Sequence, residues 1–209
     1  MDFLYLLNHE ECLSTLPRTG WVQHKVTNPE TVASHALGVA FLVRTFLPEG
    51  LDKAKCLDMA VIHDQAEALI GDITPFDGVD AKTKEEMELR AMQTIAKRLG
   101  TPDLVDVFQE YQAQKTPEAR FVKDMDRIQA VFKALQYDRT NRSGQEVFPE
   151  FLANAESHLQ TQTGRAVLSS FLTQCDAEIK RVHAKRIRRW GGVVLIKGQV
   201  FRLAESHHR

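Results

Sequence analysis

Several features that mark particular protein classes are scarce or absent in this sequence. Only three of its 209 residues are cysteines, Cys12, Cys56 and Cys175, and such an odd, widely spaced set does not make a disulfide framework. No apolar run approaches the roughly 20 residues that a membrane span needs. The acidic start, with Asp2 and then Glu10-Glu11, lacks the basic region of a secretory signal. We therefore expect reduced thiols, a cytoplasmic location and no membrane partner.

An excess of charge of one sign is also missing. The chain has 27 basic and 28 acidic residues and a formal net charge of -1 at pH 7, which argues against general electrostatic attachment to nucleic acid or to anionic membranes. One basic run occurs near the C-terminus, but Ile179, Val182 and Ile187 are interleaved with it at helical spacing. We expect this run to be the solvated face of a helix and expect no nucleic-acid partner. Its basic residues are Lys180, Arg181, Lys185, Arg186, Arg188 and Arg189.

The remaining composition, with 43% hydrophobic and 26% charged residues, is typical of a globular protein. Capping residues followed by helical periodicity predict an all-α fold, a compact bundle of about seven or eight helices. The expected helices cover residues 2–14, 28–47, 52–71, 80–99, 149–160 and 165–190, with Asn28 and Asp52 as N-caps. Two more begin at Thr101-Pro102 and Thr116-Pro117, each a capping threonine followed by proline. Residues 193–203 predict a small C-terminal β-hairpin with a Lys197-Gly198 turn. We therefore expect one helical domain over residues 1–190, followed by a hairpin and tail over 191–209.

Four polar residues lie far apart in the sequence, each in a segment that favours a helix: His35, the adjacent pair His63-Asp64, and Asp126. The pair ends an apolar run, residues 59–62, where burial of an unpaired charge is costly. Nitrogen and oxygen ligands without cysteine suit a divalent metal with an open coordination position. Taken alone, His35 is more often a core histidine, and either aspartate is equally consistent with an ordinary salt bridge.

Two further carboxylates follow the pair. Glu67 is four residues after His63, which places the two side chains on one face of a continuous helix. Gly71 permits the left-handed backbone that ends a helix, and Asp72 then lies just past its terminus. A Gly-Asp pair is also an ordinary helix exit. The segment nevertheless offers two metal ligands and two spare carboxylates, which suits the activation of water and the handling of a leaving-group proton.

Four segments in order resemble the HD-domain metal-dependent phosphohydrolases, and in particular their 5'-deoxynucleotidase branch. They are residues 16–21 (LPRTGW), 29–35 (PETVASH), 63–72 (HDQAEALIGD) and 121–126 (FVKDMD). The sequence departs from the branch in two places. Ser34 replaces the acid that commonly precedes the first histidine, and residues 127–129 (RIQ) replace an amide and a glutamate.

The resemblance implies a compact HD-domain bundle and one divalent ion, either Mn, Co, Ni, Fe, Zn or Mg, held by His35, His63, Asp64 and Asp126. It implies that Glu67 acts on the attacking water and Asp72 on the proton at the 5'-oxygen, although the two roles are exchangeable. Homodimerisation is implied as well, with the apolar N-terminal helix and the C-terminal hairpin as contact surfaces.

The substrate expected from the resemblance is a small nucleotide, a deoxyribonucleoside 5'-monophosphate. Arg18 is expected to bind its phosphate through a planar guanidinium, and Trp21 to crowd the sugar where a ribonucleotide carries its extra hydroxyl. The plainer alternatives are that Arg18 pairs with a surface acid and that Trp21 fills the core. Two other functions keep the metal site: a phosphohydrolase acting on a cyclic nucleotide or an alarmone, and a non-catalytic sensor that binds a nucleotide.

Overall fold

The computed structural model describes residues 1–189, 193–196 and 199–202, with side chains described as far as residue 175. The chain divides into two compact units, Met1–Arg165 and Ala166–Arg209. The elements, in chain order, are α1 (Phe3–Thr15), α2 (Thr19–Gln23), α3 (Val32–Phe46), α4 (Lys53–Ile62), α5 (Glu67–Ile70), the 3-10 helix η1 (Pro75–Asp77), α6 (Ala81–Leu99), α7 (Asp103–Ala113), α8 (Pro117–Arg139), α9 (Phe148–His158), α10 (Gln162–Arg189), β1 (Val193–Ile196) and β2 (Gln199–Arg202). The all-α prediction is therefore confirmed.

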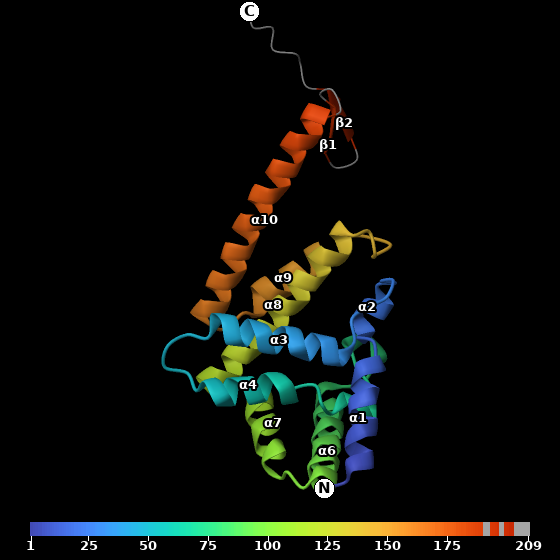
Figure 1. Cartoon of the computed structure of the whole chain (residues 1–209), viewed down its shortest axis with the longest axis vertical. Coiled ribbons are helices and arrows are strands. Elements are labelled where there is room, and N and C mark those ends of the chain that lie inside the picture. The colour runs from blue at the N-terminus through green and yellow to red at the C-terminus, as the bar shows by residue number, and fades with distance from the viewer. Residues whose placement is uncertain (190–192, 197–198, 203–209) are drawn as a thin grey trace, which may run out of the picture. The chain divides into compact units, whose positions relative to one another are not determined.

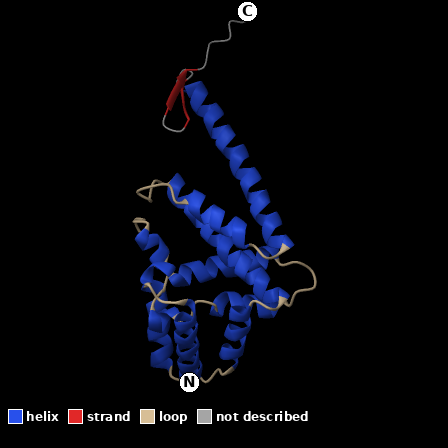
Figure 2. Ribbon diagram, turned by 180° about the vertical axis from the view of Figure 1, so that it is seen from behind, coloured by secondary structure: helices blue, strands red, loops and turns tan. Residues whose placement is uncertain are grey.

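The first unit is built around three helices that pack on one another (Figure 1). Helix α3 packs against both α4 and α8, and α4 also packs against α8. Helices α6 and α7 pack against each other, α7 also contacts α4 and α8, and α1 contacts α3, α5 and α6. Figure 2 shows that loops connect these helices throughout the unit. Segments far apart in sequence therefore meet where α3, α4 and α8 come together.

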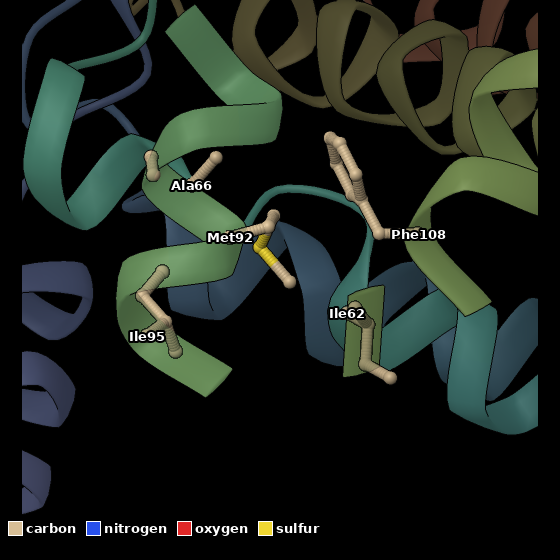
Figure 3. Close-up of a cluster of buried hydrophobic side chains, with 6 residues drawn as sticks. Ile62, Ala66, Met92, Ile95 and Phe108 are labelled. Atoms are coloured by element: carbon tan, nitrogen blue, oxygen red, sulfur yellow. The ribbon is translucent and has the colours of Figure 1, made fainter. Parts of the chain in front are cut away.

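Two hydrophobic clusters stabilise the unit. The first lies between α4, α6 and α7 and is shown in Figure 3; its buried residues are Ile62, Ala66, Ala91, Met92, Ile95 and Phe108. The second joins α2 to α8 and consists of Trp21, Val26, Ala134, Tyr137 and Val147. The first cluster contains Ala66 of the segment 63–72, and the second contains Trp21 and Val26, which precede α3. Burial of these side chains stabilises both segments, because burial of apolar side chains is the main favourable contribution to folding.

Most predicted helix starts are confirmed, and two are wrong. Asp52, Asp80 and Thr116 cap their helices by accepting a hydrogen bond from a backbone N–H three residues later. The predicted cap at Asn28 is wrong: Asn28 adopts a φ of 51°, and Thr31 caps α3 instead. The predicted cap at Thr101 is also wrong, because the residue preceding α7 is Pro102 and no side chain caps this helix.

The predicted single helix over residues 52–71 is wrong as well. Helix α4 ends at Ile62, and residues 63–66 form turns before the four-residue α5. In these turns Gln65 N–H bonds to the carbonyl of Ile62, and Glu67 N–H to that of Asp64, three residues back instead of four. Because of this break and the additional short helix α2, the described residues hold ten α-helices rather than seven or eight.

The second unit contains most of α10 and the two strands. Strands β1 and β2 pair antiparallel, with Val193 opposite Arg202 and Ile196 opposite Gln199. The predicted Lys197-Gly198 turn lies outside the described residues, as do Trp190 and Leu203, so the hairpin as a whole stays a prediction. The side chains of the basic run also lie outside, and the predicted boundary after residue 190 stays a prediction. No helix among the described residues is long and apolar enough to cross a membrane.

Candidate metal centre

The residues expected to bind a metal converge where α3, α4 and α8 meet. One ligand atom each from His35, His63 and Asp126 lie within 4.8 Å of one another. His35 Nε2 lies 3.0 Å from Asp126 Oδ1 and 3.4 Å from His63 Nε2. Both imidazoles are buried, in α3 and directly after α4. His35 and Asp126, 91 positions apart in the sequence, therefore direct their side chains to the same place.

Asp64 joins this group from the turn that follows His63. Its Oδ2 lies 3.1 Å from His63 Nε2 and 3.6 Å from His35 Nε2. The same oxygen accepts a hydrogen bond of 2.8 Å from the guanidinium of Arg18, at the start of α2. The break after Ile62 therefore brings His63 and Asp64 into the same site, where a continuous helix would turn consecutive side chains apart.

The hydrogen bonds behind the two imidazoles show what the site is able to hold. His63 Nδ1 lies 2.9 Å from the carbonyl oxygen of Ala60, and His35 Nδ1 lies 2.7 Å from Gln129 Oε1. Because both partners are acceptors, each Nδ1 carries the proton and each Nε2 presents a lone pair. The two lone pairs and the Asp126 carboxylate then point at one place, with Asp64 Oδ2 beside them, and this arrangement is able to hold a divalent cation.

Asp126 has two different oxygen environments. Its Oδ1 faces His35, whereas its Oδ2 accepts hydrogen bonds from the Tyr111 hydroxyl at 3.1 Å and from Lys123 Nζ at 2.9 Å. Burial alone raises the pKa of this carboxyl, but Lys123 and the two imidazoles hold the pKa well below its usual range. Asp126 is therefore ionised, with one oxygen occupied by protein donors and the other directed into the site.

The ionisation of Asp64 and His63 depends on neighbouring charges. Burial raises the pKa of Asp64, but His63 and Arg18 outweigh it and hold this pKa well below its usual value. Burial lowers the pKa of His63, and the carboxylates of Asp64 and Asp126 outweigh it and raise the pKa. A proton therefore competes with a cation for His63 Nε2.

Glu67 and Asp72 lie close enough to Arg18 to interact with its charge. Glu67 is buried, its Oε2 has no protein partner within the described part of the chain, and burial together with Asp64 and Asp72 raises its pKa to about 11. Asp72 Oδ2 accepts a 2.7 Å hydrogen bond from the backbone N–H of Thr19. Burial lowers the pKa of Arg18, but the carboxyl groups of Asp64, Asp72 and Glu67 outweigh it and raise this pKa, so Arg18 stays charged.

A sequence profile described as "HD domain" matches residues 11–166, about three quarters of the chain. This chain belongs to the HD-domain family. The predicted family is confirmed, and the matched residues include every ligand candidate.

Similar proteins were found in fungi and animals. The chain is 37% identical over 139 residues to "5'-deoxynucleotidase hdd1" of Schizosaccharomyces pombe, which covers 62% of this chain and 70% of that protein. It is 34% identical over 163 residues to "5'-deoxynucleotidase HDDC2" of Bos taurus, covering 76% of this chain and 78% of the relative. Among solved structures, a conserved hypothetical protein from Pyrococcus furiosus is 27% identical, with a TM-score of 0.66, covering 80% of this chain and 97% of that one.

Trp21 differs from the other residues expected at this HD-domain site because it is packed in the hydrophobic core. Trp21 is 2% exposed; its ring stacks on Phe151 at 4.3 Å and its Nε1–H donates to Glu30 Oε1 at 2.9 Å. This packing favours the alternative that Trp21 fills the core, and its predicted contact with a sugar stays a prediction. By contrast, His35, His63, Asp64 and Asp126 converge, with Arg18, Glu67 and Asp72 beside them.

Sequence reasoning missed four residues that support the HD-domain site: Glu30, Tyr111, Lys123 and Gln129. Three of them carried a signal. Glu30 and Lys123 lie inside the resembling segments 29–35 and 121–126, and Gln129 appeared only as a departure from the branch. Tyr111 carried none, since its role depends on a contact with Asp126 that no local pattern contains.

Proposed function

We propose that this HD-domain protein is a metal-dependent 5'-deoxynucleotidase, which hydrolyses deoxyribonucleoside 5'-monophosphates to a deoxyribonucleoside and phosphate. The observation that carries the proposal is the convergence of two imidazole lone pairs with two ionised carboxylates, next to an arginine. The relatives from yeast and cattle, both called 5'-deoxynucleotidases, support the choice of substrate.

His35, His63, Asp64 and Asp126 are the proposed ligands of one divalent cation. When bound, this cation makes water more acidic and offsets the negative charge that develops at phosphorus. Nitrogen and oxygen ligands accept Mn, Co, Ni, Fe, Zn or Mg, and metal analysis of the purified protein identifies the ion.

The residues beside the ligands have separate roles in this proposal. Arg18 binds the substrate phosphate, because a planar guanidinium donates two parallel hydrogen bonds to phosphate oxygens. Glu67 acts on the attacking water, since its buried Oε2 has no protein partner in the described structure. It would take the proton of this water only with the cation bound, because a nearby cation lowers the raised pKa of a carboxyl. Asp72 handles the proton at the 5'-oxygen and fixes the backbone of Thr19, next to Arg18. Glu67 and Asp72 are exchangeable in these two roles.

The substrate is tested by phosphate release from a metal-supplemented panel. The panel pairs each deoxyribonucleoside 5'-monophosphate with its ribonucleotide and its 3'-monophosphate, and adds a cyclic nucleotide and an alarmone. We expect the fastest release from the deoxyribonucleoside 5'-monophosphates. Equal rates on the deoxy and ribo partners contradict the substrate preference. Turnover of the cyclic nucleotide or alarmone alone moves the enzyme to another phosphoester, and binding without release identifies a sensor.

The predicted role of Trp21 requires a separate test, because its indole is buried in the second hydrophobic cluster. Trp21→Phe keeps an aromatic ring against Phe151 but removes the Nε1–H that donates to Glu30. A sugar contact predicts that this variant accepts ribonucleotides better relative to deoxyribonucleotides. A core role predicts a lower melting temperature with an unchanged ratio of the two rates.

We also propose that the protein is a homodimer in a cytoplasmic location. Large apolar side chains are exposed on α1 and α3, among them Phe3, Leu4, Leu37 and Phe41, each at least 70% exposed. Exposed apolar side chains on two helices that pack against each other favour association. Sedimentation or light scattering should give a dimer mass, and a monomer at micromolar concentration contradicts the proposal.

A further inference from the structure

A buried row of polar side chains lies behind His35, on the side opposite to the proposed metal. His35 Nδ1–H donates to Gln129 Oε1 at 2.7 Å, and Gln129 Nε2 donates to Glu30 Oε2 at 3.0 Å. At the far end, Trp21 Nε1–H donates to Glu30 Oε1 at 2.9 Å. All four side chains are buried. They come from α2, the residue before Thr31, α3 and α8, so the row joins four separate segments.

The row has a definite direction because its two ends both donate. Trp21 has only an N–H, and a metal-binding His35 must also offer its N–H at Nδ1. An amide has one accepting and one donating end, so a row made only of amides leaves two N–H groups facing each other. A single acceptor-only group removes this conflict, and the carboxylate of Glu30 is that group. It turns the amide nitrogen of Gln129 toward itself and the amide oxygen toward His35.

Two features fit Gln129 and Glu30 to these positions. A Cβ at Gly38, in α3 one turn after His35, would lie 2.9 Å from Gln129 Nε2, so the glycine leaves the space that the amide occupies. Lys133 Nζ lies 3.5 Å from Glu30 Oε2 and partly neutralises this buried anion. Glu30 Oε1 itself lies 4.0 Å from His35 Nδ1, too far for a hydrogen bond, so Gln129 is the link between them.

We propose that Glu30 and Gln129 are positioning residues of the metal centre, and that the Glu30 carboxylate fixes the tautomer of His35 through Gln129. This proposal rests on the proposed metal ligands. Glu30 and Gln129 touch neither metal nor substrate. Their effect is to keep the proton of His35 on Nδ1 and the lone pair on Nε2, directed toward His63 and Asp126.

The test first removes the acceptor-only group from position 30 and then places it at position 129. Glu30→Gln leaves two consecutive amides between two N–H donors, and this favours the His35 tautomer with the proton on Nε2, which does not bind metal. We expect zinc affinity, measured by chelator competition, to fall by roughly ten- to a hundredfold.

The double variant Glu30→Gln/Gln129→Glu restores one acceptor-only group to the row. The amide introduced at position 30 accepts from the Trp21 N–H through its oxygen and donates through its nitrogen to the carboxylate introduced at position 129. That carboxylate accepts from His35 Nδ1–H, so the metal-binding tautomer is favoured again. We expect zinc affinity to recover toward the wild-type value.

The controls separate this proposal from the metal site itself. Glu86→Gln removes a charge from the exposed surface of α6 and should leave zinc affinity unchanged. His35→Ala should lose zinc binding. If His35→Ala binds zinc as tightly as the wild type, the ligand assignment has failed. If His35→Ala loses zinc but Glu30→Gln binds it normally, or if the double variant binds no better than Glu30→Gln, the positioning role has failed.

A second variant keeps the test decisive if Glu30→Gln does not fold. Gly38→Ala retains every charge and hydrogen-bonding group, and alanine favours the helical conformation over glycine. Its added methyl displaces the Gln129 amide from between His35 and Glu30, so we expect a folded variant with weaker zinc binding. Wild-type zinc affinity in folded Gly38→Ala overturns the proposal, because the displaced amide then has no effect on His35.

Discussion

At the scale of single residues, Asp124 and Asp126 lie two positions apart in α8 and have different partners. Asp124 is fully buried, and its carboxylate accepts hydrogen bonds from the backbone N–H groups of Gln160 and Thr161. Asp126 faces His35. We expect Asp126→Ala to lose metal and activity together, because a ligand is removed. The measurement is metal content beside turnover.

Asp124→Ala is the matched control for Asp126→Ala. Since hydrogen bonds to a charged group contribute roughly 1.5–3 kcal/mol each, its loss should lower the free energy of unfolding by several kcal/mol while the folded protein keeps its metal. Full metal content in Asp126→Ala, together with metal loss in Asp124→Ala, would reverse the two assignments.

Glu67 has a role distinct from those of the ligands. We expect Glu67→Gln to retain the metal and to lose turnover by roughly 10²–10⁴-fold, the usual contribution of general acid–base catalysis. Elemental analysis and rates on the same sample decide this. If the variant loses its metal, Glu67 is a ligand or supports one.

The raised pKa of Glu67 also predicts how the stability of the chelator-treated protein depends on pH. The folded state keeps the proton up to about 11, whereas the unfolded chain releases it near the ordinary value of 4.5. Between these values the folded state binds more protons, so wild-type stability falls as pH rises. Glutamine does not titrate. The melting temperature of Glu67→Gln should therefore exceed that of the wild type by more at pH 8 than at pH 5, and an opposite trend would contradict the raised pKa.

At the scale of elements, the start of α3 shows both the reach and the limit of local sequence signals. Asn28-Pro29 has the chemistry of a helix start, yet the chain continues for three more residues in a non-helical path. This path brings Glu30 to Trp21 and Gln129, which are contacts that no local pattern contains. The turns after Ile62 have a similar origin, since they place Asp64 next to Arg18. By contrast, Asp52, Asp80 and Thr116 cap helices through local bonds alone, and the sequence predicted them.

Thr31 and Asn28 test this account of α3. The Thr31 hydroxyl oxygen accepts from the backbone N–H of Ser34, so Thr31→Ala should lower the free energy of unfolding by about 0.5–2 kcal/mol. Asn28 has a left-handed backbone and caps nothing, so Asn28→Gly should cost little. Chemical denaturation of the two variants compares them directly. A larger loss in Asn28→Gly would mean that the sequence-based start was the correct one.

The candidate site was predictable to the extent that its chemistry is carried by residue type. Buried imidazoles and carboxylates are costly without a partner, and for this reason His35, His63, Asp64 and Asp126 stand out in the amino-acid sequence alone. The residues that orient them, Gln129 and Tyr111, are ordinary polar or aromatic side chains whose importance comes only from distance. Trp21 shows the converse case, because a motif resemblance gave it a substrate role while its packing places it in the core.

At the scale of the whole molecule, the metal should act as a cross-link within the first unit, because its ligands come from α3, α8 and the turn after α4. Chelation should lower the melting temperature, since a ligand that binds only the folded state adds about 2.7 kcal/mol at a hundred times its dissociation constant. This increment should shrink as pH falls, because binding requires an unprotonated Nε2. The raised pKa of His63 means that the loss begins above the ordinary value of 6.5. Calorimetry with and without chelator, from pH 8 to pH 6, measures the increment, and His35→Ala should show none. An equal melting temperature for the metal-loaded and chelated wild type would show that the cation does not stabilise the fold. In that case α3, α4 and α8 are held together by packing alone.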